Sequence, residues 1–374
     1  MQRMMRKLIR YCWPPASIAR LLLVMLGLTG CEEAPPIVLL DQSVGASPLK
    51  SPPFLVSGST EQRFLAVFDN NLYVWNLEGQ RVGARQRLPF SVNEIFPTNT
   101  GALAVGREGF IAIDMNGTTQ AAFGFEHDPE RIYWAVAVGK EEIFVTSAGL
   151  QHDITVKVYH LDGHRIGPPF HFVRPKFGTI LAASRLGDEN YVLVWEEDRS
   201  LYAEILSKEG QRVREPFLLY SVGKGGALQR GSTQRREDGS VLVAWQDSSP
   251  GPWSVMALII KPDGAVEIIG RVNPQESTDA TRVSIPRGAN GRAVAWVSGT
   301  HWGKFAVSGQ GRVLVQAVYA HSPAYLFQAS GSVQSFSMAM RNARALVLGS
   351  VRQTTAEDHT LGYNVYAGFV SFPQ

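Results

Sequence analysis

The chain has 374 residues, of which 45% are hydrophobic and 18% charged, and its formal net charge is +3 at pH 7. This composition excludes an intrinsically disordered chain, and so small a net charge does not by itself indicate nucleic-acid binding. The two cysteines, Cys12 and Cys31, both lie near the N-terminus. The rest of the chain can therefore form neither an internal disulfide nor a cysteine metal site.

Residues 1–30 have the layout of a secretory signal peptide. A basic stretch without acidic residues precedes the apolar run 21–28, which is too short to span a bilayer comfortably. The sequence Leu28-Thr29-Gly30-Cys31 resembles the bacterial lipobox. The resemblance implies cleavage before Cys31 and acylation of that residue, which would anchor the mature chain to a membrane. The alternative is an ordinary signal peptide in which Cys31 has no special role.

The residues after Cys31 predict a location and a tether. Under the enterobacterial sorting rule, Asp after the cysteine retains a lipoprotein at the inner membrane, so Glu32 favours the outer membrane. Residues 31–53 are rich in Pro, Ser and Gly and predict a lipid-anchored tether. Within it, residues 36–42 hold one compact apolar run. Residues 54–374 are expected to form a single folded domain.

Hydrophobic strand cores recur through this domain at intervals of about 40–50 residues, a spacing typical of propeller blades. The cores are residues 64–68, 103–105, 143–145, 191–195, 241–245, 293–296 and 345–348. The apolar run after a core often ends in an Asp-Gly-like turn, as at Gly79, Gly117, Gly163, Gly210 and Gly264. Glycine accepts the positive φ that such hairpins require. The pattern predicts an all-β propeller of seven four-stranded blades, within a range of six to eight.

Three stretches resemble known propeller repeats. LYVWNLEG, residues 72–79, resembles a WD-repeat strand, although the Gly-His partner is missing. IAIDMNG, residues 111–117, resembles the pyrroloquinoline-quinone type repeat, but the tryptophan after its glycine is absent. VLVWEED with LYAEILSKEG, within residues 192–210, is most similar to the loose Trp and Asp-Gly repeats of bacterial propellers. The resemblance covers about residues 60–372 and implies a propeller without a particular chemistry.

The last repeat is one strand short, because it offers only residues 335–340, 345–351 and 364–372 before the chain stops. Propellers often close by borrowing a strand from the other terminus, which removes an exposed edge. We therefore expect the apolar run 37–40 to pair with residues 364–372. In the sixth repeat, residues 313–319 are the candidate outer strand.

Trp195, Trp245 and Trp296 occupy one repeat position. They suit either sugar stacking or packing between blades, and packing is favoured because their strands are the most apolar. His152, His160, His164 and His171 crowd one repeat and could bind a metal, but the sequence holds no fixed metal motif. A solvated hairpin is therefore favoured, and no metal or other cofactor is expected.

Acidic residues follow the Trp strands, at Glu196, Glu197, Asp198 and Asp247. Carboxylates from several blades can converge into a hydrolytic site, but no known catalytic motif is present, and exposed turns are favoured. Catalytic residues therefore stay unassigned.

Four arginines lie eight to ten residues before equivalent repeat positions and form a candidate anion-binding group: Arg185, Arg235, Arg287 and Arg341. Each falls where an innermost strand turns into the next, so we expect them around one face near the central channel. Gathered there, they would attract an anionic ligand. The alternative is four solvated turn residues, two of them neutralised by nearby acids: Asp188 and Glu189 beside Arg185, and Glu237 and Asp238 beside Arg235.

The sequence leaves three functional hypotheses. The first is a membrane-anchored protein of the bacterial cell envelope whose propeller binds a protein or glycan partner, and not nucleic acid. The second is an envelope hydrolase acting on a glycan or lactone. The third is a factor similar to the propeller lipoprotein of the outer-membrane barrel-assembly machinery.

Overall fold

The computed structural model describes residues 37–41, 55–126, 131–149, 153–173, 177–249, 253–273, 280–288, 291–298, 312–317, 324–328, 333–341, 344–353 and 362–371. All of them belong to one compact unit, Pro36–Gln374. Cys31 and His152 lie outside the described residues.

The described strands form seven antiparallel sheets of four strands each. Their members, innermost strand first, are β2 (Leu55–Ser59), β3 (Arg63–Phe68), β4 (Asn71–Asn76) and β5 (Gln86–Arg87); β6 (Glu94–Thr98), β7 (Gly101–Val105), β8 (Gly109–Asp114) and β9 (Thr119–Gly124); β10 (Arg131–Val138), β11 (Glu142–Gly149), β12 (Asp153–His160) and β13 (Arg165–Val173); β14 (Phe177–Leu186), β15 (Asn190–Glu197), β16 (Ser200–Ser207) and β17 (Arg212–Ser221); β18 (Leu228–Arg235), β19 (Val241–Asp247), β20 (Ser254–Ile260) and β21 (Val266–Arg271); β22 (Ala280–Ser284), β23 (Ala293–Ser298), β24 (Arg312–Ala317) and β25 (Ala324–Gln328); and β26 (Val333–Arg341), β27 (Arg344–Gln353), β28 (Gly362–Ser371) and β1 (Ile37–Asp41).

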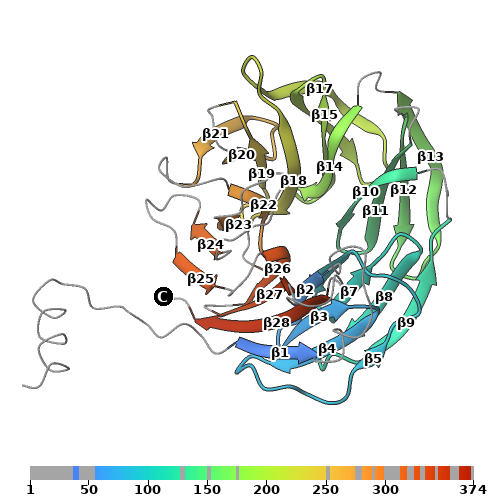
Figure 1. Cartoon of the computed structure of the whole chain (residues 1–374). Coiled ribbons are helices and arrows are strands. Elements are labelled where there is room, and N and C mark those ends of the chain that lie inside the picture. Colours follow the sequence, from blue (N-terminus) through green and yellow to red (C-terminus); the bar gives the residue numbers. More distant parts are fainter. Residues whose placement is uncertain are drawn as a thin grey trace, which may run out of the picture. The chain divides into compact units, whose positions relative to one another are not determined.

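The sheets follow one another around a ring, with the first strand of each facing the middle (Figure 1). First strands of most neighbouring sheets lie side by side, including β2 with β6 and β2 with β26, where the start of the ring meets its end. The expectation of an all-β propeller is thereby confirmed. Among the described residues, no helix is both long and apolar enough to cross a membrane.

Each predicted strand core is the second strand of its sheet. These strands are the most completely buried: in β19, for example, every residue from Val241 to Asp247 is buried. A second strand lies between two others within its sheet and is covered on both faces by neighbouring sheets. Such a strand has no polar face to alternate with its apolar one, which is why continuous apolar runs mark these strands in the sequence.

Three tryptophans at the ends of these second strands join neighbouring sheets. Trp195 packs in one cluster with Ala135 and Phe144 of the β10–β13 sheet. Trp245 packs likewise with residues of the β14–β17 sheet, and Trp296 with residues of the β18–β21 sheet. All three side chains are at most 1% exposed. The packing interpretation is therefore confirmed, and none of the three offers a free ring face for stacking a sugar.

The predicted turn glycines also link one sheet to the next. Gly163 adopts φ +90° between β12 and β13. A Cβ at this position would lie 2.8 Å from Phe123 of the preceding sheet. The same positive φ occurs at the other predicted turn glycines, Gly79, Gly117, Gly210 and Gly264. Glycine is therefore required at Gly163 both for the backbone conformation and for the close approach of the sheets.

The ring is closed by an N-terminal strand, as expected. β1 pairs antiparallel with β28, with Val38 opposite Ala367 and Leu39 opposite Tyr366. The prediction for the sixth repeat was wrong, because β24, which overlaps residues 313–319, is the third strand of its sheet and β25 is the outer one. The connection between β23 and β24 is long, so the spacing from the strand core placed the outer strand one strand too early.

Candidate functional site in the central channel

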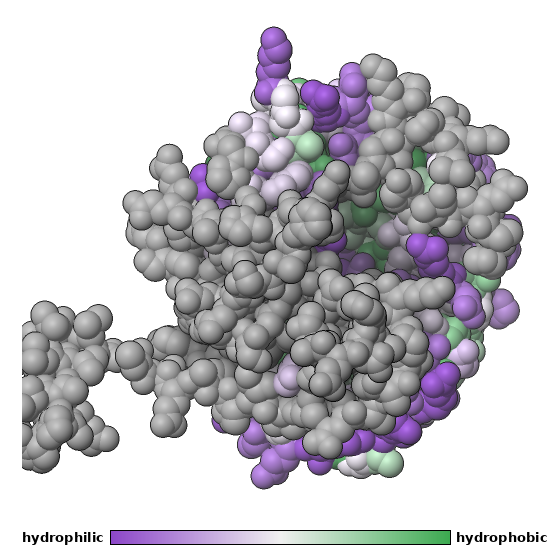
Figure 2. All heavy atoms as spheres, in the orientation of Figure 1, coloured by the Kyte–Doolittle hydropathy of each residue, from purple (hydrophilic) through white to green (hydrophobic). Residues whose placement is uncertain are grey.

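The first strands of five sheets line an open cavity of about 280 Å³ in the middle of the ring. Its walls come from β2, β6, β18, β22 and β26 and from the residues next to them. Figure 2 shows the molecule hollowed near the centre of the ring, with hydrophobic surface inside the hollow. The cavity therefore collects side chains that lie far apart in the sequence.

An ion pair between Glu94 and Arg287 lies in the wall of this cavity. Arg287 also donates a hydrogen bond to Gln234 Oε1 at 2.7 Å, and its guanidinium lies 4.6 Å from the ring centre of Phe96. Burial raises the pKa of Glu94, while the charge and hydrogen bond of Arg287 act in the opposite direction. The two formal charges cancel.

Arg230 contributes a second guanidinium to the cavity wall. It lies in a β-bulge of β18: Gln229 pairs with Gln246 and Ser232 with Ala244, so Arg230 and Gly231 together face one residue of β19. Arg230 adopts φ +47°. Burial lowers the pKa of its guanidinium. The residue is nevertheless exposed, because its side chain faces the open cavity.

Hydroxyl groups complete the polar part of the wall, at Ser57, Ser232, Ser284 and Ser337. Ser57 and Ser337 share a hydrogen bond of 2.9 Å between their Oγ atoms, which links β2 to β26. Ser232 Oγ accepts a hydrogen bond from the Ile285 backbone N–H at 3.4 Å. Ser284 lines the cavity and is partly exposed. The wall of the cavity is thus mixed, with charged groups, hydroxyls and the Asn93 amide among apolar side chains.

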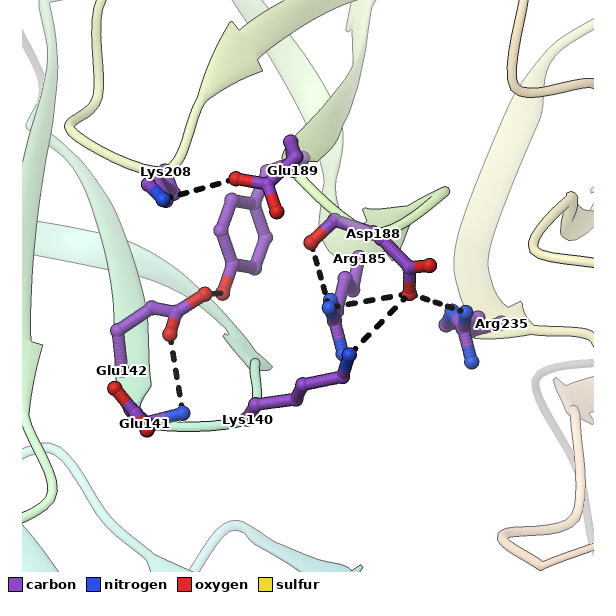
Figure 3. Close-up of polar contacts among 9 residues, drawn as sticks. Lys140, Glu141, Glu142, Arg185, Asp188, Glu189, Lys208 and Arg235 are labelled. Atoms are coloured by element: carbon purple, nitrogen blue, oxygen red, sulfur yellow. Dashed lines mark hydrogen bonds and ion pairs between the residues drawn. The ribbon is translucent and has the colours of Figure 1, made fainter.

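A second polar cluster surrounds Asp188, at the turn between β14 and β15 (Figure 3). Arg185 and Arg235 each lie 3.4 Å from Asp188 Oδ1, and Lys140 lies 3.9 Å from it. These cations come from three neighbouring sheets. The same group holds Glu141, Glu142 and Glu189, together with Lys208. Its four basic and four acidic side chains therefore balance, and the cluster joins sheets without a net formal charge.

The four predicted arginines lie at or just beyond the ends of first strands, as expected, and each has an acidic partner. Arg185 and Arg235 share Asp188, Arg287 pairs with Glu94, and Arg341 pairs with Glu61 at 3.4 Å. Three of these partners lie on another sheet. Within the described part of the chain, the Nε atoms of Arg185, Arg235 and Arg341 are buried without a hydrogen-bond partner.

The acids expected to neutralise Arg235 bind elsewhere. Glu237 pairs with Arg292, and Asp238 pairs with Arg236 at 3.9 Å. Glu189 pairs with Lys208 at 2.9 Å. Of the four acids expected to neutralise Arg185 and Arg235, Asp188 is the one that does so among the described contacts, and it pairs with both arginines.

The other candidate residues lie away from the cavity wall. The described histidines of the crowded repeat are exposed, and His171 Nδ1 lies 2.9 Å from Thr155 Oγ1. Trp195 Nε1 donates to Glu197 Oε2 at 3.2 Å, and Glu196 and Asp198 belong to the same hairpin. Asp247 is fully buried and accepts a hydrogen bond from Tyr220 at 2.5 Å. Over the residues that the structure describes, no three His, Cys, Asp or Glu side chains gather so as to hold a metal ion.

Sequence reasoning missed Lys140, Glu94 and Arg230. Lys140 lies two residues after the first strand β10. A position at the end of a first strand was also the signal that identified the four arginines, so it could have identified Lys140. Glu94 begins β6, but its partner Arg287 is 193 residues away. Arg230 depends on a bulge, which no repeat spacing indicates.

Comparisons with known proteins support the fold. No protein-family model and no curated relative matches the chain. The WD40 domain of Pan2 from Neurospora crassa is 10% identical, with a TM-score of 0.53 over 91% of this chain and 97% of that domain. An oligogalacturonate lyase from Vibrio parahaemolyticus is 12% identical, with a TM-score of 0.53 over 89% of this chain and 98% of the lyase. At such low identities, these likenesses show the β-propeller fold alone.

Proposed function

We propose that this chain is a lipoprotein of the bacterial cell envelope, anchored through acylated Cys31, whose seven-bladed propeller binds a protein or glycan partner at its central cavity. The outer membrane is the proposed location, because Glu32 stands where Asp would favour the inner membrane. Residues 1–30 would be the signal peptide, and most of residues 31–53 would be the tether. The proposal includes no cofactor and no nucleic acid.

The cavity is the observation that carries the proposal. Its volume of about 280 Å³ is just below the usual range for small-molecule sites, about 300–1,000 Å³. One sugar unit or one side chain of a partner fits such a space, whereas a folded domain does not. Small-molecule sites combine apolar surface with polar groups that fix the orientation of the ligand, and this cavity is richer in polar groups than most. Arg230, Arg287 and the serine hydroxyls are such groups.

Among the four predicted arginines, Arg287 is proposed to contact the ligand, because it lines the cavity. Arg185, Arg235 and Arg341 are bound to carboxylates at strand ends. These ion pairs favour a role in holding neighbouring sheets together, with a secondary contribution to the positive potential around the channel.

The substitution S284F tests the proposal. A phenyl group at Ser284 would fill much of the cavity, and the change would leave the backbone pairing of Ser284 with Ala295 in place. The matched control is S221F, on the exposed outer strand β17. Saturation-transfer NMR would follow binding of soluble glycan and peptide fragments, released from bacterial envelopes, to the full chain in detergent. Thermal unfolding would confirm that both variants fold.

We expect the wild-type chain and S221F to bind a common set of fragments, and S284F to lose that binding by tenfold or more, equivalent to about 1.4 kcal/mol. Equal binding by folded S284F and wild-type chain would overturn the proposal. The same samples test the hydrolase hypothesis, because a hydrolase would shorten the fragments during the measurement.

A further inference from the structure

The conformation of Arg230 sets it apart from other residues. Five non-glycine residues in the described ranges have a positive φ. Four form two-residue hairpin turns, namely Asp69 with Asn70 and Asp198 with Arg199, where a positive φ is the normal geometry. The fifth is Arg230, inside a strand. Strained backbone of this kind persists where surrounding structure imposes it, and it is concentrated at functional sites.

The bulge has a direct effect on where Arg230 lies. Leu228, on one side of the bulge, packs in the core between the β14–β17 and β18–β21 sheets. Thr233, on the other side, donates a hydrogen bond to the Ala183 carbonyl of the same neighbouring sheet at 2.9 Å. Because the bulge adds one residue to the strand, the Thr233 side chain faces the same neighbouring sheet as Leu228 does. Arg230 falls outside this alternation of side chains and lines the cavity.

The guanidinium of Arg230 has no ion pair or hydrogen bond with any other described residue, unlike that of Arg287. Because Glu94 already compensates Arg287, the cavity wall carries one uncompensated positive charge. Arg230 is exposed to the cavity, but the surrounding wall still removes part of the water from its guanidinium, which lowers its pKa. A bound anion would supply the missing partner.

We infer that Arg230 binds the anionic group, carboxylate or phosphate, of a small hydroxylated ligand in the central cavity. A guanidinium presents paired N–H donors that match either group. Ser232 and Ser284 lie in the same wall and suit the hydroxyls of such a ligand. The inference rests on the proposed function, since it names the ligand class of the same cavity.

This site differs from the Asp188 cluster at the other end of β18. Arg230 and Arg235 are five residues apart on one strand, which corresponds to about 15 Å. Variants of the cluster therefore serve as controls for general charge effects. Arg199 is a closer match to Arg230, because it is also an exposed arginine with a positive φ.

The test is a titration of the full chain in detergent with glucuronate, glucose 6-phosphate and glucose, followed by NMR or calorimetry. The variants are R230Q, R230G, R199Q and S284F. R230G removes the charge while it relieves the backbone, so it keeps the test valid if R230Q folds poorly. Both charged probes share the proposed chemistry, and they separate a carboxylate preference from a phosphate preference.

We expect at least one charged probe to bind the wild-type chain and to bind it more tightly than glucose. R230Q and R230G should weaken this binding tenfold or more, whereas R199Q should change it by less than about twofold. If S284F abolishes binding but R230Q and R230G do not, the inference fails and the proposed function stands. If no charged probe binds, or if glucose binds equally well, the inference is overturned.

Discussion

At the residue scale, glycines and tryptophans show how the repeat is held together. Gly117 combines φ +88° with a close approach to Val74 of the preceding sheet. Trp245 fills the space between two sheets and is 1% exposed. Burial of a side chain of this size contributes several kcal/mol to stability, at about 25 cal/mol per Å² of apolar area. Both residue types therefore mark places where one sheet meets the next.

Tyr191 is a residue whose contribution depends on pH. Its hydroxyl donates to Glu142 Oε1 at 2.7 Å, and its ring stacks on Phe144 with 4.7 Å between centroids. Burial, followed by the hydrogen bond and the charge of Glu142, raises its pKa. The stability that depends on neutral Tyr191 is complete below its unfolded pKa of about 10 and is lost as the pH rises further.

The variant Y191F should lose about 1.5–3 kcal/mol of unfolding free energy at pH 8, because the hydrogen bond to a charged acceptor is gone. The difference from the wild-type chain should narrow at pH 11, since only the wild-type chain then loses the benefit of a neutral Tyr191. Urea unfolding at both pH values measures this difference. Tyr159 and Tyr220, whose pKa values burial also raises, are present in both proteins and cancel in the comparison. A difference that stays constant between the two pH values would contradict the account.

The sequence predicted the role of a residue where the same packing contact recurs in several sheets. It did not predict the role of a residue that occurs in one sheet alone. The tryptophans and turn glycines recur, so spacing alone identified them. Register shifts also occur in the first strands β10, β14, β22 and β26, but among the described first strands Arg230 is the one non-glycine residue with a positive φ. A positive φ at an arginine costs about 1–3 kcal/mol, and no pattern of neighbouring residues in the sequence signals it.

At the element scale, the sequence predicted second strands best and outer strands least well. A second strand is apolar throughout, because sheets cover both of its faces. Outer strands such as β17 expose much of their length, including Val213 and Leu218, and carry bulges. Their pattern is therefore irregular, and a long connection before β24 was enough to shift the prediction for that sheet by one strand.

The role of strand β1 in closing the ring can be tested by mutation. This strand is the outermost strand of its sheet, and among the described strands it pairs with β28 alone. In an antiparallel pair, alternate residues direct their N–H groups to the partner. Proline at both Val38 and Leu39 must therefore remove at least one of these donors, whichever residue provides it.

We expect V38P/L39P to lower the unfolding free energy by about 1–3 kcal/mol in urea, followed by tryptophan fluorescence. The control is A46P/S47P, which adds two prolines in the predicted tether and should have no measurable effect. Equal stability of the two double variants would show that the strand does not close the ring.

At the scale of the whole molecule, the contacts that build the site connect distant parts of the chain. Arg344 donates a hydrogen bond to the Leu77 carbonyl at 2.6 Å, and Ser57 meets Ser337 across the closure of the ring. The cavity is made in the same way, from strands spread over nearly the entire domain. Repeat spacing placed the arginines on a common circle, but their ion-pair partners depend on side-chain geometry that one sequence does not display.

The most direct test of a lipid-anchored binding protein is native mass spectrometry of the full chain, extracted from bacterial membranes in mild detergent. We predict a chain that begins at Cys31, carries acyl groups and retains a small bound molecule. S284F should keep the acyl groups and lose the small molecule, and C31A should leave the membrane fraction without acyl groups. An unacylated wild-type chain, or the same bound mass in wild-type chain and S284F, would contradict the account.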